Sequence, residues 1–124
     1  IYFLDRKSEA FLVFLQFKAL VEKQSDNEIK MLKTYRSGEF IYTPFMNYCK
    51  ENGIKRQLTV RHSPQHNGVA ARKHRTIVEM ARSMLNGKGL PNKFWAEAVN
   101  TAVYMLNRSP TKAVQNKTPY EAWH

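Results

Sequence analysis

A polar loop leads directly into a basic helix in the middle of this chain. The segment reads Val60-Arg61-His62-Ser63-Pro64-Gln65-His66-Asn67-Gly68-Val69-Ala70-Ala71-Arg72-Lys73-His74-Arg75. The amide and imidazole groups of Gln65, His66 and Asn67 can hydrogen-bond bases or sugars, and the arginines can grip phosphate oxygens. This layout suits a nucleic-acid active site, but the position where such chemistry wants a carboxylate is Ala71. The segment therefore predicts a site that keeps binding groups and lacks a reactive one.

The positive charge of the chain gathers around the same segment. Twenty Lys and Arg residues stand against ten Asp and Glu residues, for a net charge of +10 over 124 residues. Between Lys55 and Lys93 the only acid is Glu79. Clustered charge of this size favours a polyanionic partner, although a solvated basic face without a ligand is the alternative. The residues predicted to bind nucleic acid are Lys55, Arg56, Arg61, Gln65, His66, Asn67, Arg72, Lys73, Arg75 and Arg82.

The spacing of these cations indicates a two-sided helix that begins near Gly68. Steps of three, four and three residues put Arg72, Arg75, Glu79 and Arg82 on one face. An apolar stripe occupies the other face and would pack on a core; it comprises Ile77, Met80, Ala81, Met84 and Leu85. The helix thus predicts an exposed row of guanidinium groups.

Other kinds of chemistry find little support in the composition. The single cysteine, Cys49, allows no internal disulfide and follows aromatic residues typical of a buried helix face. The four histidines have no zinc-ligand spacing. The longest apolar stretch, Ala10 to Leu15, is too short to span a bilayer. With no signal peptide in the sequence, we expect an intracellular chain without a membrane partner.

The elements that must position these residues alternate in type, which predicts one α/β domain over residues 1–124. Strands are expected at Ile1–Leu4, Glu28–Thr34 and Ile54–Val60, the first being the end of a strand that begins outside the chain. Ser8 is expected to cap a helix to about Gln24. The other helices are expected at Thr43–Gly53, Gly68–Asn86 and Pro91–Asn107, with a last turn capped at Thr118-Pro119.

Several segments together resemble the integrase catalytic core of copia-type long-terminal-repeat retrotransposons. They are Ile29–Thr34 with Ser37–Phe40, Asn52–Ile54, Ser63–Ala70, Leu90–Ala98, Leu106–Thr111 and Thr118–Trp123, in the order of that family. The resemblance covers essentially the whole chain. It implies a ribonuclease H-like α/β fold, a mixed sheet flanked by helices, with the first strand missing.

The resemblance also implies what happened to the reactive groups. Active members hold two Mg²⁺ or Mn²⁺ ions on two aspartates and a glutamate, because these ions prefer hard anionic oxygen ligands. The first aspartate would precede Ile1, the second matches Tyr35, and the glutamate matches Ala71, with 35 residues between the last two positions. A phenol and a methyl group cannot replace carboxylates as ligands. No intact catalytic residue, no metal site and no cofactor are therefore expected.

Three functions stay open at this point. The first is a catalytically dead core that binds DNA, with RNA as another ligand, in the nucleus where the family acts. The second is a protein-interaction or dimerisation scaffold, for which the apolar residues Leu12, Val13 and Leu15 would supply a surface. The third is a degenerate fragment with no function, in which those same residues reflect drift.

Overall fold

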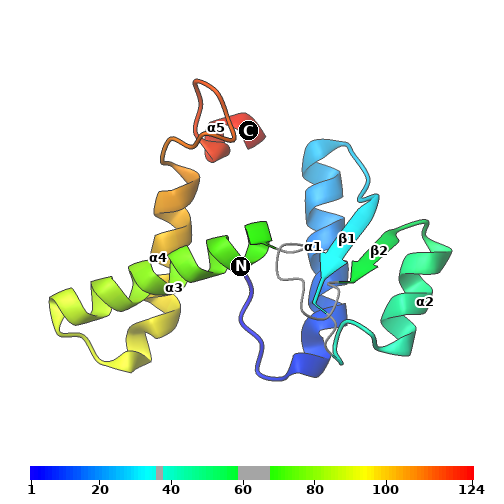
Figure 1. The fold of residues 1–124 in the computed structure, drawn as a ribbon, viewed down its shortest axis with the longest axis horizontal. Coiled ribbons are helices and arrows are strands. Elements are labelled where there is room, and N and C mark those ends of the chain that lie inside the picture. Colours follow the sequence, from blue (N-terminus) through cyan, green and yellow to red (C-terminus); the bar gives the residue numbers. More distant parts are fainter. Residues whose placement is uncertain (36–37, 59–67) are drawn as a thin grey trace. The chain divides into compact units, whose positions relative to one another are not determined.

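The computed structural model describes residues 1–35, 38–58 and 68–124 (Figure 1). The chain divides into two compact units: an N-terminal unit, Tyr2–Gly68, and a C-terminal unit, Val69–His124 together with Ile1. Each unit is described by itself, so the single domain expected over residues 1–124 stays a prediction. Four of the predicted binding residues lie outside the described residues, namely Arg61, Gln65, His66 and Asn67.

The N-terminal unit is a helix followed by a strand-helix-strand arrangement. Its elements are the 3-10 turn η1 (Lys7–Glu9), α1 (Ala10–Ser25), β1 (Met31–Thr34), α2 (Thr43–Glu51) and β2 (Lys55–Leu58). The two strands run parallel, with Met31 opposite Lys55 and Thr34 opposite Leu58. Parallel neighbours need a crossover connection, which contains α2. β1 is shorter than the expected strand from Glu28 because its pairing begins only at Met31.

Aromatic side chains build the core of the N-terminal unit. Phe14 of α1 and Phe45 of α2 stack with ring centroids 5.1 Å apart. Phe45 and Cys49 are completely buried, and Ile54 closes the cluster beside β2. Pro44 near the start of α2 presets a helical backbone angle. The prediction that Cys49 lies on a buried helix face is confirmed.

Two predictions for the start of the chain are wrong. Ile1–Leu4 form no strand among the described residues and are exposed, since a four-residue apolar segment needs a neighbouring strand to hold β structure. Ser8 does not cap a helix. It lies inside η1, and Glu9, the residue before α1, makes no side-chain cap bond to that helix. The Glu9 carboxylate instead accepts the backbone N–H groups of Asp5 (2.9 Å) and Arg6 (3.2 Å), at the start of η1.

The face of α1 is also narrower than its sequence suggests. Ala10 and Phe14 are buried, while Phe17 and Leu20, further along the same helix, are 41% and 50% exposed. Leu12 is 59% exposed. Phe17 meets the ring of Tyr2 edge-on, with centroids 6.2 Å apart, and α1 otherwise keeps these apolar side chains largely at the surface.

The C-terminal unit is a pair of packed helices with a short third helix. It contains α3 (Gly68–Lys88, of which Gly68 is counted with the other unit), the 3-10 turn η3 (Asn92–Phe94), α4 (Trp95–Asn107) and α5 (Pro119–Trp123). Ala81 and Leu85 of α3 meet Ala98 and Val99 of α4 in its core. The contact between the two helices is thus made by small and aliphatic side chains. Figure 1 shows α3 and α4 as neighbouring elements of this unit.

The ends of these helices follow the residues that sequence reasoning selected, with one correction. α3 runs to Lys88, two residues past the expected Asn86, and contains Gly87. Gly89 follows it with a left-handed φ of +61°, a conformation that glycine adopts without strain. The predicted cap at Thr118 is confirmed: its hydroxyl accepts the N–H of Glu121 (3.3 Å), whose carboxylate accepts the N–H of Thr118 (2.8 Å).

Candidate nucleic-acid interface

The exposed side of α3 carries the predicted row of cations. Arg72, Lys73, Arg75 and Arg82 are all exposed, while Ala81 and Leu85 on the opposite side are buried against α4. The periodicity of the sequence and the packing of the helix therefore agree. The local reason is simple: burying one side of an amphipathic helix leaves its charged side in water.

These cations keep their hydrogen-bonding capacity. Among residues 1–35, 38–58 and 68–124, the one ion pair joins Lys18 to Glu22 at 2.8 Å, far from α3 in sequence. Glu79 is exposed on α3, yet it forms no ion pair with the arginines on either side in the described structure. The guanidinium groups of Arg72, Arg75 and Arg82 are thus free of carboxylate partners there, and each can take a phosphate oxygen.

Arg56 has a different environment from the one predicted. Its guanidinium lies 4.8 Å from the ring centroid of Phe45, and its Nη2 donates to the carbonyl oxygen of Phe40 (2.6 Å) and to Thr34 Oγ1 (3.2 Å). Nε and Nη1 are buried and have no hydrogen-bond partner. This placement revises the prediction for Arg56, because the group is part of the packing between β1, β2 and α2. Lys55, at the start of β2, is exposed.

Tyr35 and Ala71 are the two positions where the resemblance expects metal ligands. Tyr35 follows β1 and is 45% exposed, and Ala71 lies half-buried in the first turn of α3. They belong to different units. Within the described ranges no group of three or more His, Cys, Asp and Glu side chains could hold a metal ion. The donors at these two positions do not fit Mg²⁺ or Mn²⁺, because a neutral phenol is a poor ligand and a methyl group has no lone pair.

A stacked array of aromatic and basic side chains joins α4 to α5, and sequence reasoning missed it. The Cζ of Arg108 lies 3.8 Å from the ring centroid of Tyr104 and 4.0 Å from that of Tyr120. The rings of Tyr120 and His124 follow at 4.2 Å with a 30° tilt. The signal was the spacing of four between Tyr104 and Arg108 and between Tyr120 and His124, which puts each pair on one side of a helix.

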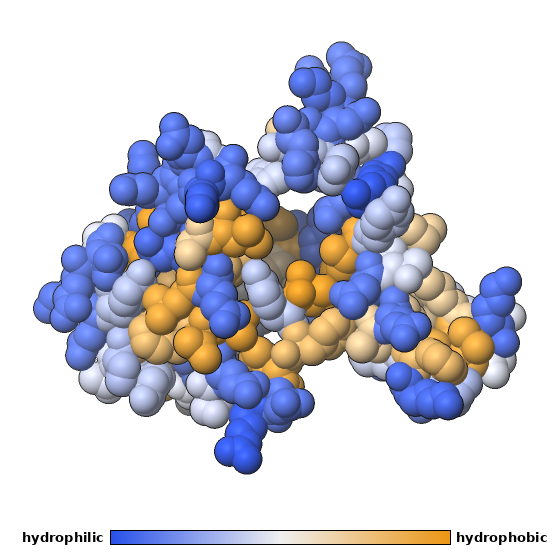
Figure 2. Space-filling view, turned by 180° about the vertical axis from the view of Figure 1, so that it is seen from behind, coloured by the Kyte–Doolittle hydropathy of each residue, from blue (hydrophilic) through white to orange (hydrophobic). Residues whose placement is uncertain are grey.

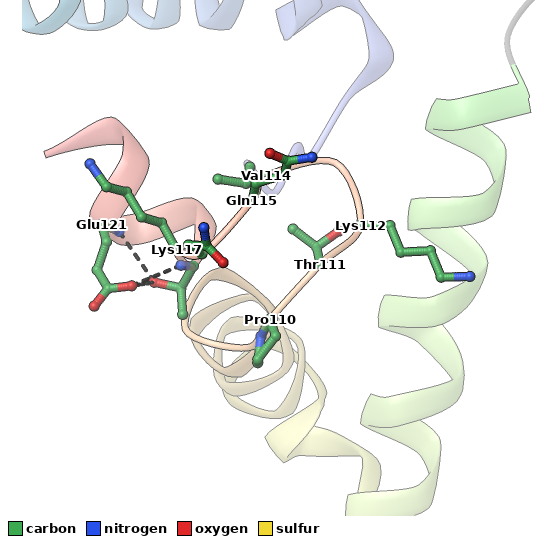
Figure 3. A pocket seen from close by; sticks show the side chains of 9 residues that line it. Pro110, Thr111, Lys112, Val114, Gln115, Lys117 and Glu121 are labelled. Atoms are coloured by element: carbon green, nitrogen blue, oxygen red, sulfur yellow. Dashed lines mark hydrogen bonds between the residues drawn. The ribbon is translucent and has the colours of Figure 1, made fainter.

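A hollow lies under the loop that connects α4 to α5 (Figure 3). Its volume is about 800 Å³, and its lining runs from Pro110 to Glu121. The pKa of Glu121 is lowered because the backbone N–H of Thr118, and then its hydroxyl, donate to the carboxylate. That carboxylate is thus ionised at neutral pH, and it already accepts hydrogen bonds from Thr118. The cationic side chains of the loop are Lys112 and Lys117, both exposed.

The remaining shifted groups stabilise the N-terminal unit. The pKa of Glu22 is lowered by the hydrogen bond from Lys18 and by the backbone N–H of Ile29, which donates at 2.8 Å. The pKa of Lys18 is raised, chiefly by its hydrogen bond to Glu22. These bonds tie the segment that enters β1 to α1. The described part of the chain contains no helix that is both long and apolar enough to cross a membrane.

Comparison with known proteins supports the family resemblance over nearly the full chain. The retrovirus-related Pol polyprotein of the tobacco transposon TNT 1-94 is 45% identical over 123 residues, which are 99% of this chain and 9% of that protein. The Pol polyprotein of the Arabidopsis thaliana transposon RE2 is 36% identical over 121 residues, 98% of this chain and 8% of that protein. These relatives are retrovirus-related Pol polyproteins of copia-type transposons, consistent with the resemblance to an integrase core. The chain spans less than a tenth of the length of these relatives.

Solved structures establish the fold of this integrase-core-like chain. The integrase catalytic core of HTLV-2, solved in complex with magnesium in a trimeric form, superposes with a TM-score of 0.66 at 20% identity, over 98% of this chain and 72% of that one. The same core in a dimeric form gives a TM-score of 0.64. The expected ribonuclease H-like α/β fold is thereby confirmed. No protein-family model matches the sequence.

Proposed function

We propose that this integrase-core-like chain binds nucleic acid through the exposed cations of α3 and catalyses no strand transfer. The observation that carries the proposal is the row of Arg72, Arg75 and Arg82, exposed and unpaired by carboxylates among the described residues. Such a row of cations contacts the phosphates of a nucleic acid and does not by itself distinguish one base sequence from another. DNA is the expected ligand and RNA is an alternative. Access to the nucleus is part of this proposal.

Electrophoretic mobility shift over a salt series tests the binding. Reversal of Arg72, Lys73 and Arg75 to glutamate removes three phosphate contacts, so the slope of log K against log salt on duplex DNA should fall by about 2.7. A matched control reverses Lys7, Lys30 and Lys50, which are exposed cations of the N-terminal unit, and should leave most of the slope intact. Equal losses in the two variants would show that only net charge matters and would overturn the assignment to α3.

The absence of catalysis is argued from Tyr35 and Ala71. Two-metal strand transfer needs several carboxylates that converge on one point, and neither side chain supplies one. We expect no tight, stoichiometric Mn²⁺ binding in a calorimetric titration. We also expect that Tyr35→Asp combined with Ala71→Glu does not restore the joining of DNA ends, because the family's first aspartate has no counterpart in this sequence. Tight Mn²⁺ binding by the unaltered chain, or end joining by the double variant, would contradict this view.

Self-association is a second candidate function, favoured by a specific observation on α1. Leu12, Phe17 and Leu20 are exposed there, and Figure 2 shows hydrophobic side chains among hydrophilic ones on the visible surface. Contiguous apolar surface of this kind is typical of protein contacts. Sedimentation at several concentrations tests it, with Leu12→Glu and Leu20→Glu as the variant. A strictly monomeric chain at high concentration would rule this function out.

A further inference from the structure

The array of side chains between α4 and α5 leaves much of its aromatic surface in water. Tyr104 is 59% exposed, although Arg108 covers one side of its ring, and Tyr120 is 41% exposed. Trp123, three residues further along α5, is 49% exposed. By contrast, Phe94 and Trp95 of the same unit are half-buried against its core. We call Tyr104, Arg108, Tyr120, Trp123 and His124 the aromatic array.

The array has a structural task, but that task does not account for its exposure. Arg108 lies between Tyr104 and Tyr120 and so fastens α5 to the end of α4. That contact uses one side of Tyr104. It does not require the other side of this ring to stay accessible. Flat rings at the surface of a basic unit offer stacking platforms for bases.

The adjoining loop adds donors and positive charge. Its exposed side chains include Lys112, Gln115, Asn116 and Lys117, which line the hollow of about 800 Å³. Figure 3 shows Lys112 and Lys117 leaving the loop in different directions, so they do not converge on one point. The one carboxylate of the lining, Glu121, is held by Thr118 through bonds of 2.8 and 3.0 Å. Two diverging ammonium groups suit successive phosphates of a strand that crosses the loop better than one small anion.

We propose that the aromatic array and this loop bind single-stranded nucleic acid. An unstacked base would lie on the exposed ring of Tyr104, and the backbone phosphates would contact Lys112 and Lys117. A duplex cannot use the array in this way, because its bases are stacked on one another and do not present their faces. The site differs from the cationic row of α3, and the two share only the class of ligand.

Two variants separate charge from stacking on a fluorescent single-stranded oligonucleotide. Lys112→Glu with Lys117→Glu removes two phosphate contacts, so the slope of log K against log salt should fall by about 1.4. Tyr104→Ala removes one stacking platform, so affinity should fall about tenfold with the salt slope unchanged. Trp123 fluorescence, isolated by a Trp95→Phe background, should be quenched as the strand binds. Circular dichroism confirms that each variant keeps its helices.

The outcomes also separate this site from α3. Reversal of Arg72, Lys73 and Arg75 should weaken duplex binding more than single-strand binding, and the loop variant should do the opposite. If the unaltered chain binds the single strand but not the duplex, the proposed function fails and this inference stands. If the folded loop variant and the folded Tyr104→Ala variant both bind the single strand as tightly as the unaltered chain, the inference is wrong. If an acidic polypeptide displaces the fluorescent oligonucleotide as well as an unlabelled single strand does, the surface attracts any polyanion and the inference is also wrong.

Discussion

The two units use the same contact, an arginine on an aromatic ring, in opposite environments. In the N-terminal unit, Arg56 lies over Phe45 with two N–H groups buried and unpaired. In the C-terminal unit, Arg108 lies between Tyr104 and Tyr120 at an exposed surface. The buried contact is part of a core, whereas the exposed one organises a surface that can still receive a ligand. The comparison shows that solvent access decides what such a pair does.

The largest expected difference comes from removing the ring itself. Phe45 is completely buried, so Phe45→Ala should destabilise its unit by about 3–5 kcal/mol. Tyr104→Ala, at an exposed ring, should cost less than about 1 kcal/mol. Urea unfolding followed by far-ultraviolet circular dichroism measures both. Similar losses for the two variants would remove the distinction between the two environments.

The same Phe45→Ala variant tests whether residues 1–124 form one cooperative domain. Both tryptophans, Trp95 and Trp123, lie in the C-terminal unit. If the chain unfolds as one domain, tryptophan fluorescence should report the same loss of stability as circular dichroism. A fluorescence transition that does not move would show that the units unfold independently.

A conservative change of each arginine should give the next largest contrast. Arg56→Lys should destabilise the N-terminal unit by about 1–3 kcal/mol, since a lysine cannot reproduce the planar contact with Phe45 or bond both Phe40 and Thr34 in the same way. Arg108→Lys should cost about 0.5 kcal/mol at its exposed site. Chemical denaturation under the same conditions measures the free energy of unfolding of both variants. An equal loss in the two would contradict the expected difference between the buried and the exposed arginine.

Helix capping gives a smaller and more local contrast. Thr118→Ala should cost about 1 kcal/mol, because the N–H of Glu121 loses its acceptor. Ser8→Ala in the N-terminal unit should stay within about 0.5 kcal/mol, because Ser8 is exposed within η1 and is not the N-cap of α1. Thermal unfolding of both alanine variants tests the assignment, and a larger effect at Ser8 would restore the cap that the sequence suggested.

The smallest expected effects depend on pH. The lowered pKa values of Glu22 and Glu121 contribute stability that is complete above their ordinary value of 4.5 and is lost as pH falls through the lowered values. The raised pKa of Lys18 adds stability to the N-terminal unit below 10.5, which is lost as pH rises through the raised value. Glu22→Gln should weaken both dependences, and Glu121→Gln only the acidic one. Melting temperatures of the unaltered chain and the two variants, measured across this pH range, test these expectations.

The sequence predicted the basic helix and its neighbours well, for a physical reason. Helix α3 has a long amphipathic period, and Thr118 and Gly89 are residues with strong preferences for helix ends. Such local preferences act before distant contacts form. The expected strand at Ile1–Leu4 fails because pairing is non-local and no neighbour pairs with it among the described residues. The cap at Ser8 fails because Ser8 lies inside η1, and α1 begins only after Glu9.

By itself, the sequence determined the similarity to transposon Pol polyproteins, the order of helices and strands after the first segment, the side of α3 that faces water, and the absence of carboxylates at Tyr35 and Ala71. These depend on residue identity and on short periods along the chain. Only the tertiary structure decided that Arg56 is packed over Phe45 while Arg108 stands at a surface between two tyrosines. The two residues have the same side chain and the same charge. Their environments differ because distant segments bury the one and leave the other in water.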